Sequence, residues 1–249
     1  MKKLFQTIQK LTRAEKNTQS VPHYIKRPIR INIHELHQVY FERNDERIII
    51  SNMNSKGFGF LGKSFSVLPA KGDVLKGVLI IEGSSFPLDL EVVYSGKNVG
   101  CKIKSISREC LNEISQYFSF EILALSLYPL NSDHLKKDPD GTPRIFVGED
   151  NCELFFVENN KNLVKFSLTI FGNYLEVDKN QNVRHGKILD NAEDGEKEMT
   201  YKKATIIQTS QDALSEEQKN KIERFILNIE NLNHEYKNEM IKLMKTKQN

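Results

Sequence analysis

The sequence predicts a mainly β protein with helices, of the α+β class, in which an antiparallel barrel or sandwich precedes a second β-containing region. Short runs of alternating apolar and polar residues recur between Asn, Ser and Gly turns from residue 31 to residue 106, which is typical of antiparallel folds. Apolar residues at helical spacing follow at 109–125 and again at 215–246.

Length and charge limit the classes of function. A chain of 249 residues accommodates one barrel and a smaller region. Its 36 Lys and Arg against 33 Asp and Glu leave a net charge of +3, without the global positive field that draws proteins to nucleic acid. A single-stranded nucleic-acid binder, which would need aromatic side chains exposed beside cations, is therefore disfavoured, and we expect any anion site to be local.

The cysteines and histidines predict no metal, cofactor or catalytic centre. Cys101, Cys110 and Cys152 are odd in number and lack CxxC spacing, which favours reduced, buried thiols and a cytoplasmic location. His34 and His37 lie three apart on a predicted strand, so we expect them to face opposite sides. The sequence contains no Walker loop, GxSxG or HExxH motif, so we do not expect an enzyme.

Residues 1–20 are predicted to form an N-terminal arm with a short amphipathic helix, because Leu4, Phe5, Ile8 and Leu11 share one face. Docking on the protein's own surface is favoured over a basic helix on a membrane surface, since the segment is short and lightly hydrophobic. No segment approaches the length of a membrane span.

A basic segment follows the arm. Lys26, Arg27 and Arg30 place three cations within five residues, and Pro28 keeps Arg27 out of helical geometry. An arginine guanidinium offers paired donors to phosphate or to guanine and a flat face for stacking on a purine. Taken alone, a solvated basic linker is the favoured interpretation of this segment.

The first strands of the predicted barrel begin at Ile31. A period-two pattern over 31–41, the Asn44-Asp45-Glu46 turn and the apolar run 47–50 together predict a hairpin. Further strands are expected at 74–81, 86–94 and 99–106. A helix over 109–125 then carries one apolar stripe that could plug or flank the barrel, formed by Leu111, Ile114, Tyr117, Phe118, Ile122 and Leu125.

The turn at 52–60, with sequence NMNSKGFGF, is the most informative local feature. Gly57 and Gly59 allow the backbone to take positive φ and a ligand to approach closely. Asn52 and Asn54 supply amides that can contact a base edge, and Ser55 supplies a hydroxyl. A purely structural turn is an equal alternative, because Asn, Ser and Gly also favour turns for backbone reasons.

The basic segment and this turn together resemble the PilZ domain family. That family is marked by RxxxR on an extended segment and by (D/N)xSxxG at a turn after the second strand; here KRPIR at 26–30 and NMNSKG at 52–57 stand in the same order. Residues 68–73 are similar to the family's turn with proline and glycine, and residues 98–103 to its glycine-bearing last strand. The resemblance covers residues 21–125.

The resemblance implies a six-stranded antiparallel barrel with a C-terminal helix that senses the bacterial second messenger cyclic di-GMP. The dinucleotide would be held between the basic arm and the turn, and its binding would regulate motility or biofilm formation through a conformational switch. The implied ligand-binding residues are Lys26, Arg27, Arg30, Asn52, Asn54, Ser55 and Gly57.

Two positions depart from the family pattern. Lys26 stands at an arginine position and cannot form the planar two-donor contact, which costs on the order of 1–3 kcal/mol. Asn54 replaces a small hydroxyl with a bulkier amide, although the neighbouring Ser55 could substitute. The alternative hypothesis is therefore a protein–protein interaction adaptor that keeps the PilZ barrel and does not bind nucleotide.

The remaining chain resembles no family known to us. We expect a linker at 126–143 and then an α+β region at 144–249 with an acidic loop at 190–198. Its predicted strands are 144–147, 152–157, 163–171, 174–177 and 204–209.

A capping box at 215–218 opens a predicted long helix over 215–246. We favour packing of its apolar stripe on the chain's own strands over a dimerising coiled coil, because Asn233 and Glu239 interrupt the seam. The C-terminal region is the expected route to a protein partner, or to a homodimer through this helix.

Overall fold

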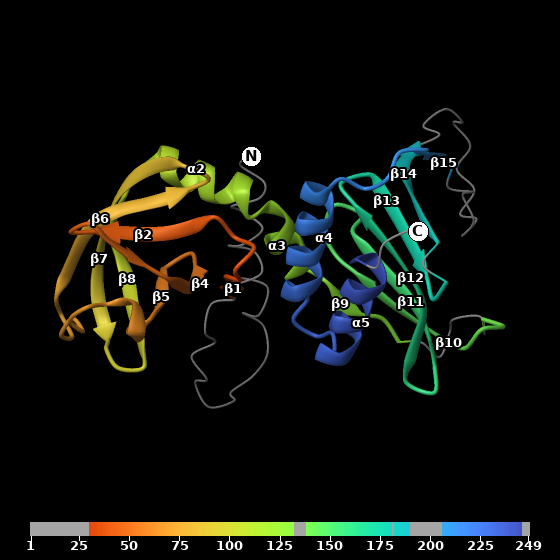
Figure 1. Cartoon of the computed structure of the whole chain (residues 1–249), viewed down its shortest axis with the longest axis horizontal. Helices are drawn as coiled ribbons and strands as arrows, with labels where there is room; N and C mark the ends of the chain where they lie inside the picture. Colours follow the sequence, from red (N-terminus) through yellow and green to blue (C-terminus); the bar gives the residue numbers. More distant parts are fainter. Residues whose placement is uncertain (1–29, 132–137, 181, 190–205, 246–249) are drawn as a thin grey trace, which may run out of the picture. The chain divides into compact units, whose positions relative to one another are not determined.

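The computed structural model describes residues 30–131, 138–180, 182–189 and 206–245. The chain divides into two compact units, unit 1 (residues 1–119) and unit 2 (residues 120–249), which are drawn in Figure 1 and are considered separately below. The predicted helix at 1–20, the acidic loop at 190–198, and both Lys26 and Arg27 lie outside the described residues.

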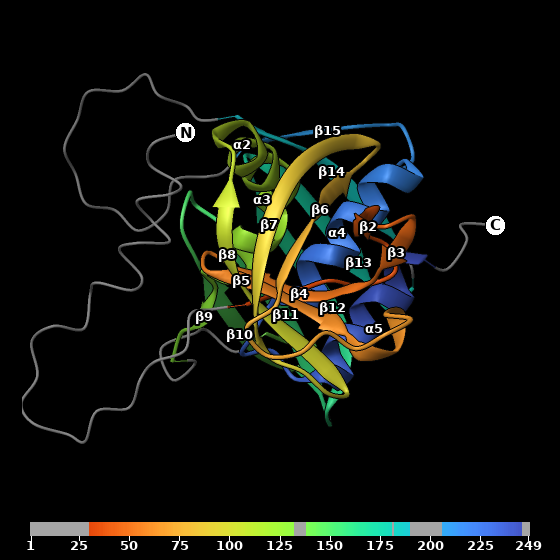
Figure 2. The same cartoon turned by 90° about the vertical axis from the view of Figure 1, so that its left-hand side faces the viewer.

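Unit 1 contains one antiparallel sheet of eight strands. They are β1 (Ile31–Asn32), β2 (Val39–Arg43), β3 (Glu46–Ile48), β4 (Ile50–Asn54), β5 (Gly57–Leu61), β6 (Val74–Ile81), β7 (Ser84–Tyr94) and β8 (Asn98–Ile106). The strand order is β1-β4-β5-β8-β7-β6-β2-β3. The sheet curls into a half-barrel (Figure 2), so that β2 contacts β4 although four strands separate them in this order.

The predicted α+β class, rich in β structure, is confirmed, but the strands of unit 1 are divided more finely than the sequence predicts. The expected strand 31–41 is interrupted by a turn at 33–38, and Ile49 separates β3 from β4. The predicted hairpin turn is confirmed, because Asn44 and Asp45 both adopt positive φ, at 50° and 61°.

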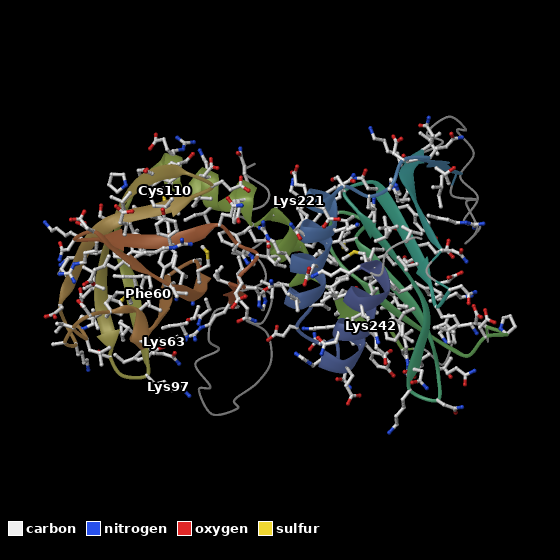
Figure 3. All side chains as sticks on the ribbon, viewed as in Figure 1. Phe60, Lys63, Lys97, Cys110, Lys221 and Lys242 are labelled. Atoms are coloured by element: carbon white, nitrogen blue, oxygen red, sulfur yellow. The ribbon has the colours of Figure 1, made fainter. Side chains whose placement is uncertain are left out.

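Alternating residues of these strands form the core of unit 1. Phe41, Phe60, Leu79 and Leu90 are fully buried, and Phe60 lies in the interior of the curled sheet (Figure 3). Its ring contacts that of Phe41 at 5.7 Å between centroids. This period-two burial is what the alternating sequence pattern predicts.

The single helix expected over 109–125 is wrong. The structure has α2 (Arg108–Tyr117) and α3 (Ser119–Ala124), separated by Phe118, whose φ of −95° and ψ of 18° end α2. Cys110, Ile114 and Phe118 are buried residues of unit 1, whereas Leu123 and Ala124 belong to the core of unit 2. The predicted stripe therefore ends at Phe118, because Ile122 and Leu125 are only half-buried and the core residues that follow in α3 are Leu123 and Ala124.

Unit 2 contains an antiparallel sheet of seven strands arranged in sequence order. They are β9 (Tyr128–Pro129), β10 (Thr142–Val147), β11 (Glu153–Asn159), β12 (Asn162–Ile170), β13 (Asn173–Asp178), β14 (Val183–Leu189) and β15 (Ile206–Thr209). The five predicted strands correspond to β10–β13 and β15, and β14 was not predicted. The segment 126–143 is not a simple linker, because Leu127 is buried in the core of unit 2 and β9 pairs with β10.

The predicted long helix over 215–246 is also wrong. The chain forms α4 (Glu216–Asn228) and α5 (His234–Lys245), which lie on one face of the sheet (Figure 1). The predicted capping box between Ser215 and Gln218 is present. The break falls where Asn233 accepts a hydrogen bond from the Glu235 backbone N–H at 3.0 Å and so begins a second helix.

The apolar residues of both helices are used inside unit 2. Phe225 and Ile226 of α4 and Met240 and Met244 of α5 are buried in one cluster with residues of the sheet. Packing on the chain's own strands, the favoured alternative, is therefore confirmed. A homodimer through this segment stays a prediction, but it loses the continuous helix on which a coiled coil depends.

Candidate functional site

A shallow hollow in unit 1 gathers most of the predicted ligand residues that the structure describes. We call it the β4–β5 hollow. Arg30, Asn52, Asn54 and Gly57 all line it, and the other lining residues are Lys56, Phe58, Gly59, Val93, Tyr94, Gly100, Cys101 and Lys102. Ser55 is exposed in the turn and does not line the hollow.

Strand pairing explains how the basic segment reaches this hollow. β1 is antiparallel to β4, with Ile31 opposite Met53 and Asn32 opposite Asn52. Extending this register by one residue sets Arg30 opposite Asn54. Two motifs that are more than twenty residues apart in the sequence therefore meet at the end of β4.

Glycines make the floor of the hollow, although not in the way the sequence suggested. Gly57 and Gly59 do not use the positive φ that a glycine allows. A Cβ on Gly57 would lie 2.0 Å from the backbone oxygen of Cys101, so β5 and β8 need a glycine here to approach each other.

Two further glycines, Gly59 and Gly100, make room for side chains, whereas Gly57 makes room for the backbone of the neighbouring strand. Gly59 is paired with Gly100 across β5 and β8. A Cβ on Gly59 would lie 2.7 Å from the side-chain nitrogen of Asn52, and one on Gly100 would lie 2.0 Å from the ring of Tyr94. The Asn52 side chain therefore occupies the space beside Gly59, and the Tyr94 ring occupies the space beside Gly100.

The side chain of Asn54 has a structural role. Its Oδ1 accepts hydrogen bonds from the backbone N–H groups of Lys56 at 2.8 Å and of Gly57 at 3.0 Å, and so closes the β4–β5 turn. Asn52 donates from Nδ2 to Ser51 Oγ at 3.1 Å, which leaves its Oδ1 for another partner. The two asparagines, equivalent in the sequence prediction, therefore differ in what they can offer a ligand.

The hollow has a local positive charge. Arg30 and Lys56 are exposed, and none of the described lining residues is acidic. Lys102 forms an ion pair with Glu91 at 2.8 Å, and its hydrogen bond lowers the pKa of that carboxyl group. This arrangement suits an anionic ligand and meets the expectation of a local site on a chain of small net charge.

Three lining residues with evident chemistry were not predicted from the sequence. Tyr94 is 47% exposed and presents an aromatic ring to the hollow, while Lys56 and Lys102 add cations. Lys56 lies inside the motif and could have been found there. Tyr94 and Lys102 come from β7 and β8, and the pairing that brings them to β5 is not encoded in a local pattern.

Cys101, His34 and His37 are further reactive side chains in the described part of unit 1. Burial raises the pKa of the Cys101 thiol to about 12, so it is not a thiolate at neutral pH. His34 and His37 lie in a turn and not on a strand, and the His34 backbone N–H donates to His37 Nδ1 at 3.0 Å, so the expected opposite orientation is wrong. The described residues contain no cluster of three or more His, Cys, Asp or Glu suited to a metal ion.

Comparison with protein-family models, with curated proteins and with solved structures finds no match for this chain. None of the helices in the described part of the chain combines the length and the apolar character needed to cross a bilayer.

Proposed function

We propose that the half-barrel of unit 1 is a PilZ-type domain that acts as a receptor for cyclic di-GMP and not as an enzyme. One observation supports this most directly: Arg30 and four residues of the 52–57 motif, Asn52, Asn54, Lys56 and Gly57, line a single, locally cationic hollow. Neither motif alone identifies the PilZ family. Together they bring a cation and amide groups to one surface.

The chemistry of the hollow suits one half of a cyclic dinucleotide. The Arg30 guanidinium can pair with a phosphate through two parallel donors. The exposed ring of Tyr94 offers a stacking face for guanine, and the Oδ1 of Asn52 can accept a hydrogen bond from the base edge. Lys56 adds a second positive charge beside the phosphate.

The rest of the ligand would be held by the basic segment. The hollow has a volume of about 170 Å³, below the ~300–1,000 Å³ of a typical ligand pocket. Lys26 precedes Arg30 by four positions in the sequence, and a fully extended chain of that length spans at most about 14 Å between Cα atoms. In this proposal Lys26 and Arg27 close over the ligand, and this movement passes the signal to the C-terminal region or to a protein partner.

The alternative is an adaptor that keeps the fold and does not bind the nucleotide. The use of Asn54 Oδ1 by the turn favours it, because that oxygen is no longer offered to a base. Lys26 in place of an arginine acts in the same direction.

Calorimetric titration of the full chain with cyclic di-GMP distinguishes the two. We expect saturable binding that weakens about tenfold or more in Arg30→Ala. Arg108→Ala, which removes an exposed arginine at the start of α2 that does not line the hollow, is expected to bind as the wild type does.

Absence of heat at tens of micromolar ligand would favour the adaptor, and equal binding by Arg30→Ala would place the site elsewhere. Salt-dependent binding of unrelated oligonucleotides would instead point to a single-stranded nucleic-acid binder.

A further inference from the structure

Unit 2 contains a cavity of different character, between its sheet and α4. Its volume is about 420 Å³, within the ~300–1,000 Å³ range of small-molecule sites. Leu168, Ile170 and Leu175 lie along its sheet side, and Phe120 from α3 and Ile222 from α4 complete the apolar lining. We call it the unit 2 cavity.

Two lysines and a histidine lie at its polar side. His185 is paired with Leu175, and Lys187 with Asn173, so His185 and Lys187 lie on the same face of the sheet as the buried Leu175. Lys221 of α4, labelled in Figure 3, also lines the cavity.

The interactions already made by these groups leave their charge accessible. His185 Nε2 lies 2.5 Å from the backbone oxygen of Asp212 and donates to it, which fixes the ring at the rim. Lys221 pairs with Glu217 at 2.6 Å, but the Glu217 side chain is 77% exposed, so this ion pair is weak and exchangeable. Lys187 is exposed and takes part in no ion pair with another described residue.

We propose that the unit 2 cavity binds a single-chain amphipathic anion, of the class of medium-chain fatty carboxylates. The hydrocarbon chain lies against Leu168, Ile170 and Leu175, and the carboxylate lies between Lys187 and Lys221. Polar ligands such as nucleotides are disfavoured, because their hydrated groups would be buried against apolar side chains without partners. An uncharged hydrocarbon ligand would contact the apolar lining but would make no ion pair with the lysines. Charge complementarity therefore favours an anion.

Decanoate and decanol, which share a chain and differ in charge, test this on the full-length protein by calorimetry. We expect saturable binding of decanoate, with decanol at least about tenfold weaker. Lys187→Glu combined with Lys221→Glu is expected to weaken decanoate binding about tenfold or more and to leave decanol binding unchanged.

The matched control makes the same change of charge, two Lys→Glu substitutions, at positions outside the cavity lining. Lys161→Glu combined with Lys179→Glu alters two exposed lysines in turns of unit 2 that do not line the cavity, and decanoate binding should stay as in the wild type. No saturable binding of decanoate, or equal loss in both double variants, would overturn the proposal.

A fluorescence measurement locates the site independently. Because the sequence contains no tryptophan, Phe120→Trp places a unique fluorophore in the cavity wall, and its emission should shift to the blue as decanoate fills the cavity. Phe155→Trp, on the opposite face of the sheet from the core residues Leu154 and Phe156, should not respond. A response of Phe155→Trp alone would place the ligand on the other face. Leu214→Trp reports from another part of the lining if Phe120→Trp does not fold.

Discussion

The β4–β5 hollow of unit 1 and the unit 2 cavity are built in opposite ways. The hollow forms where side chains are missing, at glycines on paired strands, and its motif residues lie within two short stretches of sequence. The cavity is the space left between side chains of α3, three strands and α4. Its lining residues range in sequence from Phe120 to Ile222. A site made by local glycines can be predicted from a motif, whereas a site made by distant packing cannot.

The interiors of the two units also differ in how many polar and charged side chains they bury. Among the described residues, His37 is the buried polar side chain of unit 1, whereas unit 2 buries Glu121, Glu223, Arg224 and Asn228. Unit 1 is therefore held mainly by apolar packing. Unit 2 also depends on a charge pair that must be satisfied inside the protein.

The cysteines provide a separate measurement of each unit's stability. Cys101 and Cys110 lie in unit 1 and Cys152 in unit 2, and all are buried. Burial raises their pKa values to about 12, 11 and 12, respectively. We therefore expect slow alkylation of the native thiols near pH 8, and labelling against denaturant concentration should report the unfolding of each unit.

The largest effect is expected at the buried ion pair of unit 2. Arg224 Nε donates to Glu121 Oε1 at 2.5 Å, with the Glu121 side chain fully buried. Glu121→Ala removes the carboxylate from a buried ion pair and should lower the free energy of unfolding of unit 2 by about 3–5 kcal/mol. Labelling of Cys152 should shift to lower denaturant, while labelling of Cys110 stays unchanged.

The joint replacement of both ion-pair partners sharpens this prediction. Glu121→Leu with Arg224→Leu removes both charges and should be less destabilising than Glu121→Ala alone. An equal or greater loss in the double variant would mean that the contacts of the pair, and not the burial of one charge without the other, determine the stability.

An intermediate effect separates the two kinds of glycine in the hollow. Gly57→Ala forces a methyl group against the Cys101 backbone and should cost unit 1 about 1–3 kcal/mol, measured by labelling of Cys110. Gly59→Ala meets only the movable end of Asn52, so its stability should stay within about 0.5 kcal/mol of wild type. Its affinity for cyclic di-GMP should fall about tenfold, because Asn52 is displaced. A stable Gly57→Ala protein would contradict the proposed close approach of β5 and β8.

A smaller loss of stability than that of Gly57→Ala is expected at Asn54. Asn54→Ala removes the acceptor of two backbone N–H groups in a turn and should destabilise unit 1 by about 1 kcal/mol. Asn54→Asp keeps an acceptor oxygen and should restore most of that stability in the same labelling experiment. If Asn54→Ala is neutral for stability but abolishes nucleotide binding, Asn54 acts on the ligand and not on the turn.

Local signals in the sequence were sufficient for much of the fold. Asn44-Asp45 predicted a tight hairpin, and Ser215-Gln218 predicted a helix start, because both depend on backbone geometry within four residues. β14 was missed since Arg184, His185 and Lys187 obscure its alternation. The breaks at Phe118 and Asn233 were missed because neither is marked by glycine or proline, and tertiary packing determines where each helix ends.

The candidate site shows the same limit. The sequence identified Arg30, Asn52, Asn54 and Gly57, which the structure brings together in one hollow. It could not assign Asn54 to the turn, because side-chain hydrogen bonds within four residues have the same sequence signature as a ligand contact. Tyr94 reaches the hollow only through sheet pairing, for which one sequence carries no direct signal.

The division of the apolar stripe at Phe118 has a consequence for synthesis on the ribosome. The buried core of unit 1 that the structure describes is complete once Phe118 has emerged, so this unit can fold early. The core of unit 2 closes only when Phe225 to Met244 arrive, more than a hundred residues later. Val177, the last buried strand residue described in unit 2, precedes Met244 by 67 residues. At about 5–20 residues per second, the apolar sheet face therefore waits roughly 3–13 s for its covering helices, a window in which chaperones would matter for unit 2.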